Sequence, residues 1–119
     1  MTLGDVVQAH ESALRFGGLS GIRSIGLIES AIARPYSGYY RSIYSKTAAL
    51  TYSLAKNHGF VDGNKRTALL AMTLFLDRSG YRFQAGTADV DIENMVLDVV
   101  ENRLSFTELV DWFRERLTK

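Results

Sequence analysis

An apolar run from Leu69 to Leu76 constrains the fold of this chain most strongly. Apolar side chains would cover nearly the whole circumference of a helix there. Such a helix lies at the centre of its protein, because every face needs another element to cover it. The run is broken by Thr73, is flanked by Arg66 and Asp77, and is shorter than the roughly 20 residues that span a bilayer. We therefore interpret it as a buried central helix.

Helical periodicity and stop signals predict five further helices around this one. The sequence therefore indicates an all-α fold of about six helices packed around a buried central helix. Residues 81–84 alternate and are expected to form a short extended piece. The expected helices cover residues 4–16, 24–34, 45–57, 64–79 (the central helix), 87–102 and 105 onward.

Capping residues define several of these boundaries. Ser45 and Thr87 are the expected N-caps of the third and fifth helices, and Gly59 is expected to close the third. Ser105 and Glu108 have the spacing of a capping box at the last helix. Among the apolar positions, we expect Leu27, Val90 and Trp112 to point inward.

Composition limits the classes of protein to which the chain can belong. Its 119 residues, 46% hydrophobic and 23% charged, indicate one folded domain over residues 1–119. A net charge of +1 gives no reason to expect nucleic-acid binding. The sequence shows no membrane span and no targeting segment, and it has no cysteine, which fits the cytoplasm. With only His10 and His58 as nitrogen ligands, any bound metal should be hard and oxygen-ligated.

A polar segment just before the central helix carries the chemistry-bearing residues. A helix that opens after a glycine-hinged loop offers unpaired N–H groups and a partial positive charge, which favour phosphate. Lys65 and Arg66 add full charges, Asp62 could bring in a divalent metal, and His58 could move a proton. The segment reads His58-Gly-Phe-Val-Asp-Gly-Asn-Lys-Arg-Thr-Ala68.

Structural roles are the alternative interpretation of the same residues. Alone, His58 is more often a residue that closes a helix, and Asp62 and Asn64 could be turn and N-cap residues. Lys65 and Arg66, however, stand at the end of a helix where the dipole disfavours cations, which suggests an anion. The phosphate loop of P-loop NTPases does not fit, since it requires glycine where Asn64 stands and a hydroxyl where Arg66 stands.

The segment HGFVDGNKRTA resembles the Fic-domain signature H-x-F-x-[DE]-[GA]-N-[GK]-R, in the form found in death-on-curing (Doc) toxins. In that branch a lysine stands where adenylylating Fic proteins have glycine, and here it is Lys65. The resemblance continues in Arg15-Phe-Gly-Gly-Leu-x-Gly and in Leu27-Ile-Glu-Ser-Ala-Ile-Ala-Arg-Pro35. The order, length and helical plan agree over essentially the whole chain.

The resemblance implies a role for each motif position. His58 matches the general base that takes a proton from a target hydroxyl, and Asp62 matches the acid that handles magnesium. Phe60 matches a buried anchor. The phosphates of ATP would be cradled at Gly63, Asn64 and Arg66, and at Lys65, whose presence in Doc proteins is associated with a reversed nucleotide.

The resemblance also implies a biological activity. The reaction would be transfer of the γ-phosphate of ATP to a protein hydroxyl, with elongation factor Tu as the type of target and translation arrest as the outcome. The chain would be the toxin of a toxin–antitoxin system. Its partner would be an antitoxin with a disordered segment that folds on the toxin.

Two alternatives stay open. One is AMP transfer of the Fic type, against which stands Leu69, at the position where adenylylating Fic proteins usually carry a second arginine. The other is a non-catalytic helical binding module, against which stand the intact His58 and Asp62. Outside the motif, His10 is interpreted as a surface or interhelical residue.

Overall fold

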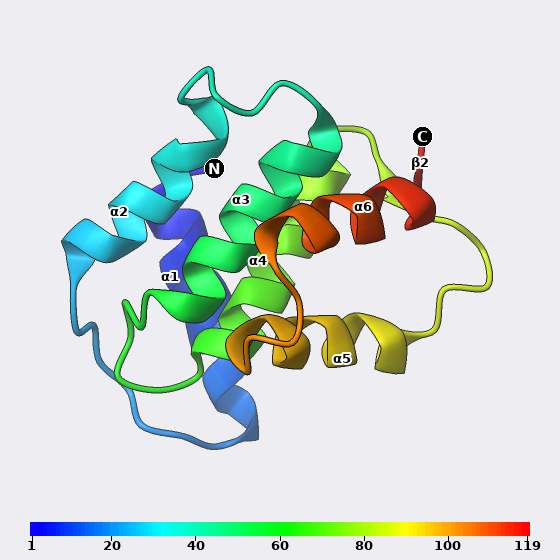
Figure 1. Cartoon of the computed structure of the whole chain (residues 1–119). Coiled ribbons are helices and arrows are strands. Elements are labelled where there is room, and N and C mark those ends of the chain that lie inside the picture. Colours follow the sequence, from blue (N-terminus) through cyan, green and yellow to red (C-terminus); the bar gives the residue numbers. More distant parts are fainter.

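Six α-helices form the body of the computed structural model, which describes residues 1–119 apart from the side chain of Phe16. Two short 3-10 helices extend the first and second α-helices. The all-α prediction is confirmed (Figure 1). The elements are α1 (Leu3–Ala13), η1 (Leu14–Phe16), α2 (Ile25–Ala33), η2 (Arg34–Tyr36), α3 (Ile43–Lys56), α4 (Asn64–Arg78), β1 (Arg82–Phe83), α5 (Asp89–Val100), α6 (Phe106–Arg116) and β2 (Leu117–Thr118).

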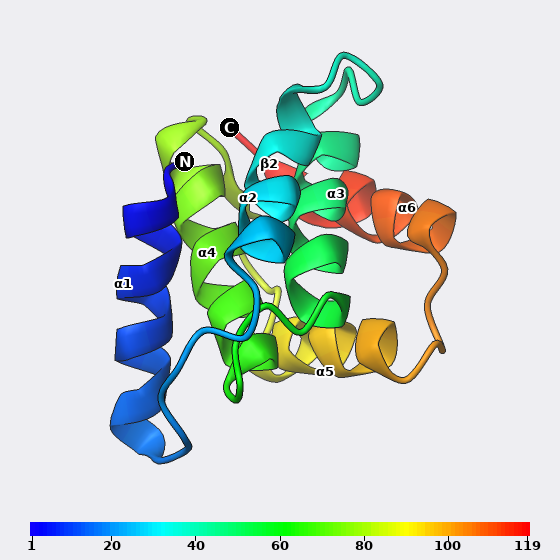
Figure 2. The ribbon, with the colours of Figure 1, turned by 90° about the vertical axis from the view of Figure 1, so that its left-hand side faces the viewer.

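Helix α4 lies at the centre of the fold, as the apolar run predicts. It packs against α3 along its length, against α1 on another side and against α5 near its beginning (Figures 1 and 2). Helix α3 is the second central element, because α2, α5 and α6 also pack against it. The buried face of α4 is made by small and large apolar residues that include Ala71, Met72 and Phe75. No helix within the described part of the chain has the length and apolarity needed to cross a membrane.

Two of the predicted N-caps are wrong. Helix α3 is capped by Ser42, whose hydroxyl accepts from the N–H of Ser45, so that the helix begins earlier than predicted. Helix α5 follows Ala88, which provides no side-chain cap, while Thr87 lies outside. The capping box of Ser105 with Glu108 at α6 is confirmed. At α3 the capping rule chose the wrong residue because Ser42 and Ser45 are closely spaced and a serine at either position can serve as a cap.

The C-terminal part contains a small two-stranded sheet, of which only one strand was predicted. Strand β1 lies in the extended piece expected at residues 81–84, and it pairs antiparallel with β2 at the C-terminus. The inward positions predicted for Leu27 and Val90 are wrong, since their side chains are 40% and 56% exposed. Trp112 is half-buried against the core.

The end of α3 differs from prediction in a way that concerns function. The left-handed residue after the helix is His58, with φ of 51°, and not Gly59. Gly59 is needed for space, because a Cβ there would lie 2.5 Å from Cγ1 of Ile28. A histidine thus occupies the backbone conformation that glycine adopts most easily.

Candidate active site

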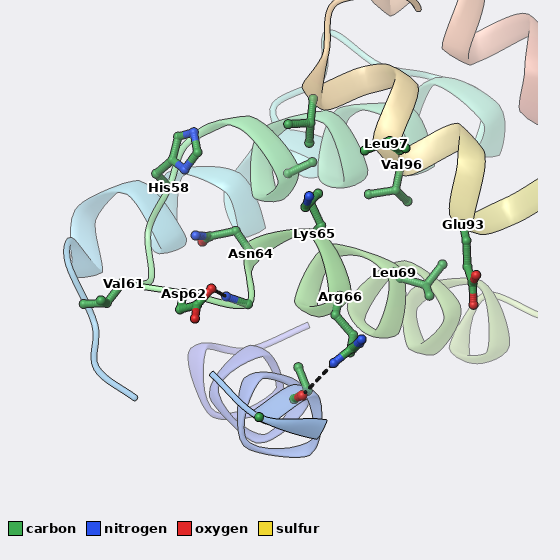
Figure 3. Close-up of a pocket in the computed structure, with 15 residues that line it drawn as sticks. His58, Val61, Asp62, Asn64, Lys65, Arg66, Leu69, Glu93, Val96 and Leu97 are labelled. Carbon is green, nitrogen blue, oxygen red and sulfur yellow. Dashed lines mark hydrogen bonds between the residues drawn. The ribbon is translucent and has the colours of Figure 1, made fainter. Parts of the chain in front are cut away.

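An open pocket of about 640 Å³ lies between the segment that joins α3 to α4 and helix α5. Its volume is in the range of sites that hold small molecules. Figure 3 shows His58 at one end of the pocket, Glu93 at the other, and Lys65 and Arg66 between them. The lining residues are Ala13, Gly17, Ala55, His58, Val61, Asp62, Gly63, Asn64, Lys65, Arg66, Leu69, Glu93, Val96, Leu97 and Val100.

The pocket brings together every motif residue to which the sequence assigned chemistry. His58 enters from the end of α3 with an exposed side chain, as a group that meets substrate must. Asp62 lies in the loop, and Lys65 and Arg66 lie in the first turn of α4. Phe60 is 2% exposed, which agrees with the expected buried anchor.

The carboxylate of Asp62 is held by backbone groups on both oxygens. Oδ2 accepts from the N–H of Leu19 at 3.1 Å, and Oδ1 accepts from the N–H of Gly63 at 2.8 Å. These two bonds, with a smaller contribution from the nearby His10, hold the pKa of Asp62 below its ordinary value. The carboxylate is therefore ionised at neutral pH and keeps lone pairs on its exposed side, as a magnesium ligand would need.

A second backbone connection fixes the motif loop to the segment before α2. The N–H groups of Arg23 and Ser24 both donate to the carbonyl of Gly59, at 2.8 and 3.0 Å. The N–H of Val61 donates to the carbonyl of Gly21 at 3.0 Å. The loop is thus held by backbone hydrogen bonds, and its shape does not depend on long, flexible side chains.

Asn64 shapes the loop from inside. Its Oδ1 accepts from the N–H of Phe60 and its Nδ2 donates to the carbonyl of Phe60, both at 3.0 Å. The side-chain amide is therefore engaged within the loop by its two hydrogen bonds to the backbone of Phe60. Gly63 takes the left-handed conformation, with φ of 75°, as the residue that precedes α4.

The beginning of α4 is suited to an anion. Gly63 offers no side-chain cap, and the first turn contains no acidic residue, among the residues whose side chains the structure describes. Lys65 and Arg66 are exposed there, and Arg66 Nη1 donates to the carbonyl of Ala13 at 3.3 Å. The helix dipole and the two cations add in sign, which favours a phosphate group at this turn.

No group of three or more potential ligands among histidine, aspartate and glutamate occurs in the described part of the chain. Asp62 is accordingly a single carboxylate at the edge of a turn that is suited to an anion. Magnesium commonly binds one or two carboxylates together with phosphate oxygens and water. The donor set thus fits a magnesium ion that arrives with a phosphate ligand, and does not fit a metal held by protein alone.

Two features of the site could not be found from the sequence. His10 was expected to be a surface or interhelical residue. Its side chain is 4% exposed, which excludes the surface alternative, and it stacks on Phe60 and bonds to the carbonyl of Asp62. Helix α5 supplies one wall of the pocket, which includes Glu93. No local motif marks either feature, because both depend on how distant helices pack.

Comparison with known proteins identifies the family. The model of the Fic/DOC family matches residues 1–76, which include α1 to α3 and the motif. The chain belongs to the Fic/DOC family. Helices α5 and α6 lie beyond the matched residues, so the α5 wall of the pocket is outside the part that the family model describes.

Two relatives extend this comparison. A protein named Toxin Doc from Mycolicibacterium smegmatis is 39% identical over 104 residues, which cover 83% of this chain and 78% of that protein. A protein named Protein kinase doc from Escherichia phage P1 is 35% identical over 81 residues. That second match spans 64% of each chain.

Proposed function

We propose that this chain transfers the γ-phosphate of ATP to a hydroxyl group of a protein. The observation that carries the proposal is the pocket in which His58, Asp62 and the cationic first turn of α4 lie together. Phosphoryl transfer depends mainly on positioning and charge neutralisation, and this site offers both. The name of the phage relative, a protein kinase, supports the same reaction class.

His58 acts as the general base in this proposal. It takes the proton of the acceptor hydroxyl as the oxygen attacks the γ-phosphorus, and the bond from that phosphorus to the β-γ bridging oxygen breaks. The exposed side chain at the pocket edge allows a protein hydroxyl to approach. A base of this kind typically contributes about 10²- to 10⁴-fold to the rate.

The remaining residues hold the triphosphate. The turn formed by Gly63, Asn64 and Lys65 receives phosphate oxygens at the N-terminus of α4, and Arg66 adds a charge. Asp62 would hold magnesium, which supplies charge neutralisation on the phosphates when bound.

Lys65 and Leu69 favour phosphate transfer over AMP transfer. Both line the pocket. Lys65 places a cation where a loop with glycine at this position would leave space. Leu69 provides no charge to stabilise an α-phosphate if ATP bound in the opposite orientation.

The biological role proposed here is that of a toxin whose target is elongation factor Tu and whose inhibitor is an antitoxin with a segment that folds on binding. The name of the mycobacterial relative supports the toxin role. Leu19, Ile22 and Val61 are exposed apolar side chains on and beside the motif loop. A protein substrate can dock on such a surface next to His58.

A labelling experiment tests the reaction. Purified protein is incubated with magnesium, elongation factor Tu and ATP labelled on either the γ- or the α-phosphate. The proposal predicts label on the target from γ-labelled ATP alone, and none with His58→Ala. Label from α-labelled ATP would instead indicate AMP transfer, and no label from either would leave the binding-module alternative.

A further inference from the structure

His10 lies beneath the motif loop. The packing of α1 does not by itself require a histidine at this position. It belongs to the inward face of α1 with Val6 and Ala13, where an apolar residue would be the ordinary choice. Its side chain is 4% exposed. It is not among the residues that line the pocket, so it can act on a bound nucleotide only through other residues.

The ring of His10 contacts the loop at two points. It stacks on Phe60 with ring centroids 3.9 Å apart and planes 10° from parallel. Its Nε2 lies 2.8 Å from the carbonyl oxygen of Asp62. Because a carbonyl only accepts, Nε2 carries the proton and donates. A Cβ on Gly63 would lie 3.6 Å from Cδ2 of the same ring, so His10 lies under the loop from Phe60 to Gly63.

The hydrogen bond from His10 acts on the peptide unit that also fixes the carboxylate of Asp62. The carbonyl of Asp62 and the N–H of Gly63 belong to one planar peptide group. The carbonyl accepts from His10, and the N–H donates to Oδ1 of Asp62 at 2.8 Å. Rotation of this peptide plane would break both bonds, so His10 restrains the donor that orients the carboxylate.

We propose that His10 is a positioning residue that sets the orientation in which Asp62 meets magnesium. The inference rests on the proposed function, in which Asp62 holds a metal that accompanies the nucleotide. Hydrogen-bonded groups behind a metal ligand commonly change metal affinity when they are removed, even though they do not touch the metal.

Two substitutions separate the hydrogen bond from the shape of the side chain. His10→Gln retains an N–H donor at nearly the reach of Nε2, whereas His10→Leu has a comparable volume and no donor. The binding of a non-hydrolysable ATP analogue is measured with and without magnesium, for both variants and the wild type, together with thermal melts. A purely structural role would lower the melting temperature and leave the effect of magnesium unchanged.

The wild type is expected to bind the analogue more tightly with magnesium than without it. His10→Leu should reduce that gain about tenfold or more, by analogy with other groups behind metal ligands, and His10→Gln should restore most of it. If His10→Leu does not fold, His10→Asn replaces it, because its shorter amide cannot reach the carbonyl. Equal magnesium dependence in the donor and non-donor variants would overturn the inference.

The same measurement distinguishes this inference from the proposed function. If the wild type itself does not bind the analogue, or binds it without magnesium dependence, the proposed function fails and the inference fails with it. If the wild type shows the dependence and His10→Leu retains it in full, only the role of His10 is refuted.

Discussion

The side chain of Asp62 and the backbone of Leu19 are joined by a hydrogen bond of 3.1 Å that connects the motif loop to the segment between α1 and α2. Residues far apart in sequence thus orient the one carboxylate of the loop. Leu19 itself is 67% exposed, so its contribution comes from its N–H group and not from side-chain packing.

Asp62→Ala is expected to abolish most of the magnesium dependence of nucleotide binding. Asp62 is the carboxylate of the loop, and magnesium needs one or two beside phosphate oxygens. Nucleotide titrations with and without magnesium measure this effect. Glu93→Ala serves as a control, because Glu93 lies at the opposite end of the pocket. Unchanged magnesium dependence in Asp62→Ala would mean that Asp62 shapes the turn and does not bind the metal.

His58→Gly is expected to separate stability from activity. The left-handed conformation costs an ordinary L-residue roughly 1–2 kcal/mol, and glycine relieves this cost but has a larger entropy in the unfolded chain. The variant should therefore match the wild type in stability or exceed it by up to about 1 kcal/mol. Its rate of target modification should fall about 10²- to 10⁴-fold.

Denaturant melts and modification assays measure the two effects of His58→Gly. His58→Asn provides a matched control, since asparagine also tolerates the left-handed region and cannot act as a base. Full activity in either variant would exclude His58 as the base. A large loss of stability in both would show that the histidine is needed for folding.

Phe75→Ala should destabilise the protein by about 3–5 kcal/mol, because the ring of Phe75 projects from α4 into the protein core and is 5% exposed. Leu19→Ala is the control and should change stability by no more than about 0.5 kcal/mol. Urea denaturation of the two variants provides the comparison. A loss of less than roughly 1 kcal/mol for Phe75→Ala would mean that α4 is not the central element.

The pair of Asp5 and Arg78 predicts a pH dependence of stability. Arg78 donates to both carboxylate oxygens of Asp5, at 2.7 and 3.1 Å, and connects α4 to α1. These bonds, with a further one from the backbone of Thr2, hold the pKa of Asp5 far below its ordinary range. Because the folded-state pKa is depressed, the stabilisation is complete above the unfolded pKa of about 3.9 and is lost as the pH falls through the folded value.

Asp5→Asn should accordingly be less stable than the wild type at neutral pH, by a margin that is constant down to about pH 5 and narrows below about pH 4. Urea denaturation over a pH series measures the margin. Asp111→Asn, which alters an exposed pair with Arg114, is the control and should change little. A margin for Asp5→Asn that widens at low pH would contradict the assignment.

Local patterns predicted the elements of this fold better than they predicted how the elements meet. The apolar run of α4 and the capping box of α6 are local, and both are confirmed. The N-cap of α3 is Ser42 and not the expected Ser45, because the hydroxyl of Ser42 accepts from the N–H of Ser45. The exchange of roles between His58 and Gly59 depends on tertiary structure, because the contact with Ile28 that requires glycine comes from α2.

The candidate site shows the same difference between what local sequence patterns predict and what depends on contacts between distant elements. His58 and residues 61–66 lie close together in sequence, so the motif places them in one pocket without knowledge of the tertiary structure. His10 reaches Asp62 only because α1 packs against α4, and its sequence neighbours give no sign of that contact. Glu93 enters the pocket for the same kind of reason, through the packing of α5 against α4.

The choice between phosphate and AMP transfer depends on Lys65. Lys65→Gly opens space beside the first turn of α4, and the phosphate chain could then bind in the opposite direction. Phosphorylation should fall sharply, and AMP transfer should be weak because Leu69 supplies no charge. Lys65→Met, which keeps the length of the side chain, is the control for loss of charge alone.

The most direct test is the intact mass of elongation factor Tu after incubation with ATP, magnesium and either the wild type or Lys65→Gly. We expect the wild type to add the mass of one phosphoryl group, and Lys65→Gly to add far less of it. Undiminished phosphorylation by Lys65→Gly would contradict the role of Lys65. Addition of AMP by the wild type would contradict the proposed reaction itself.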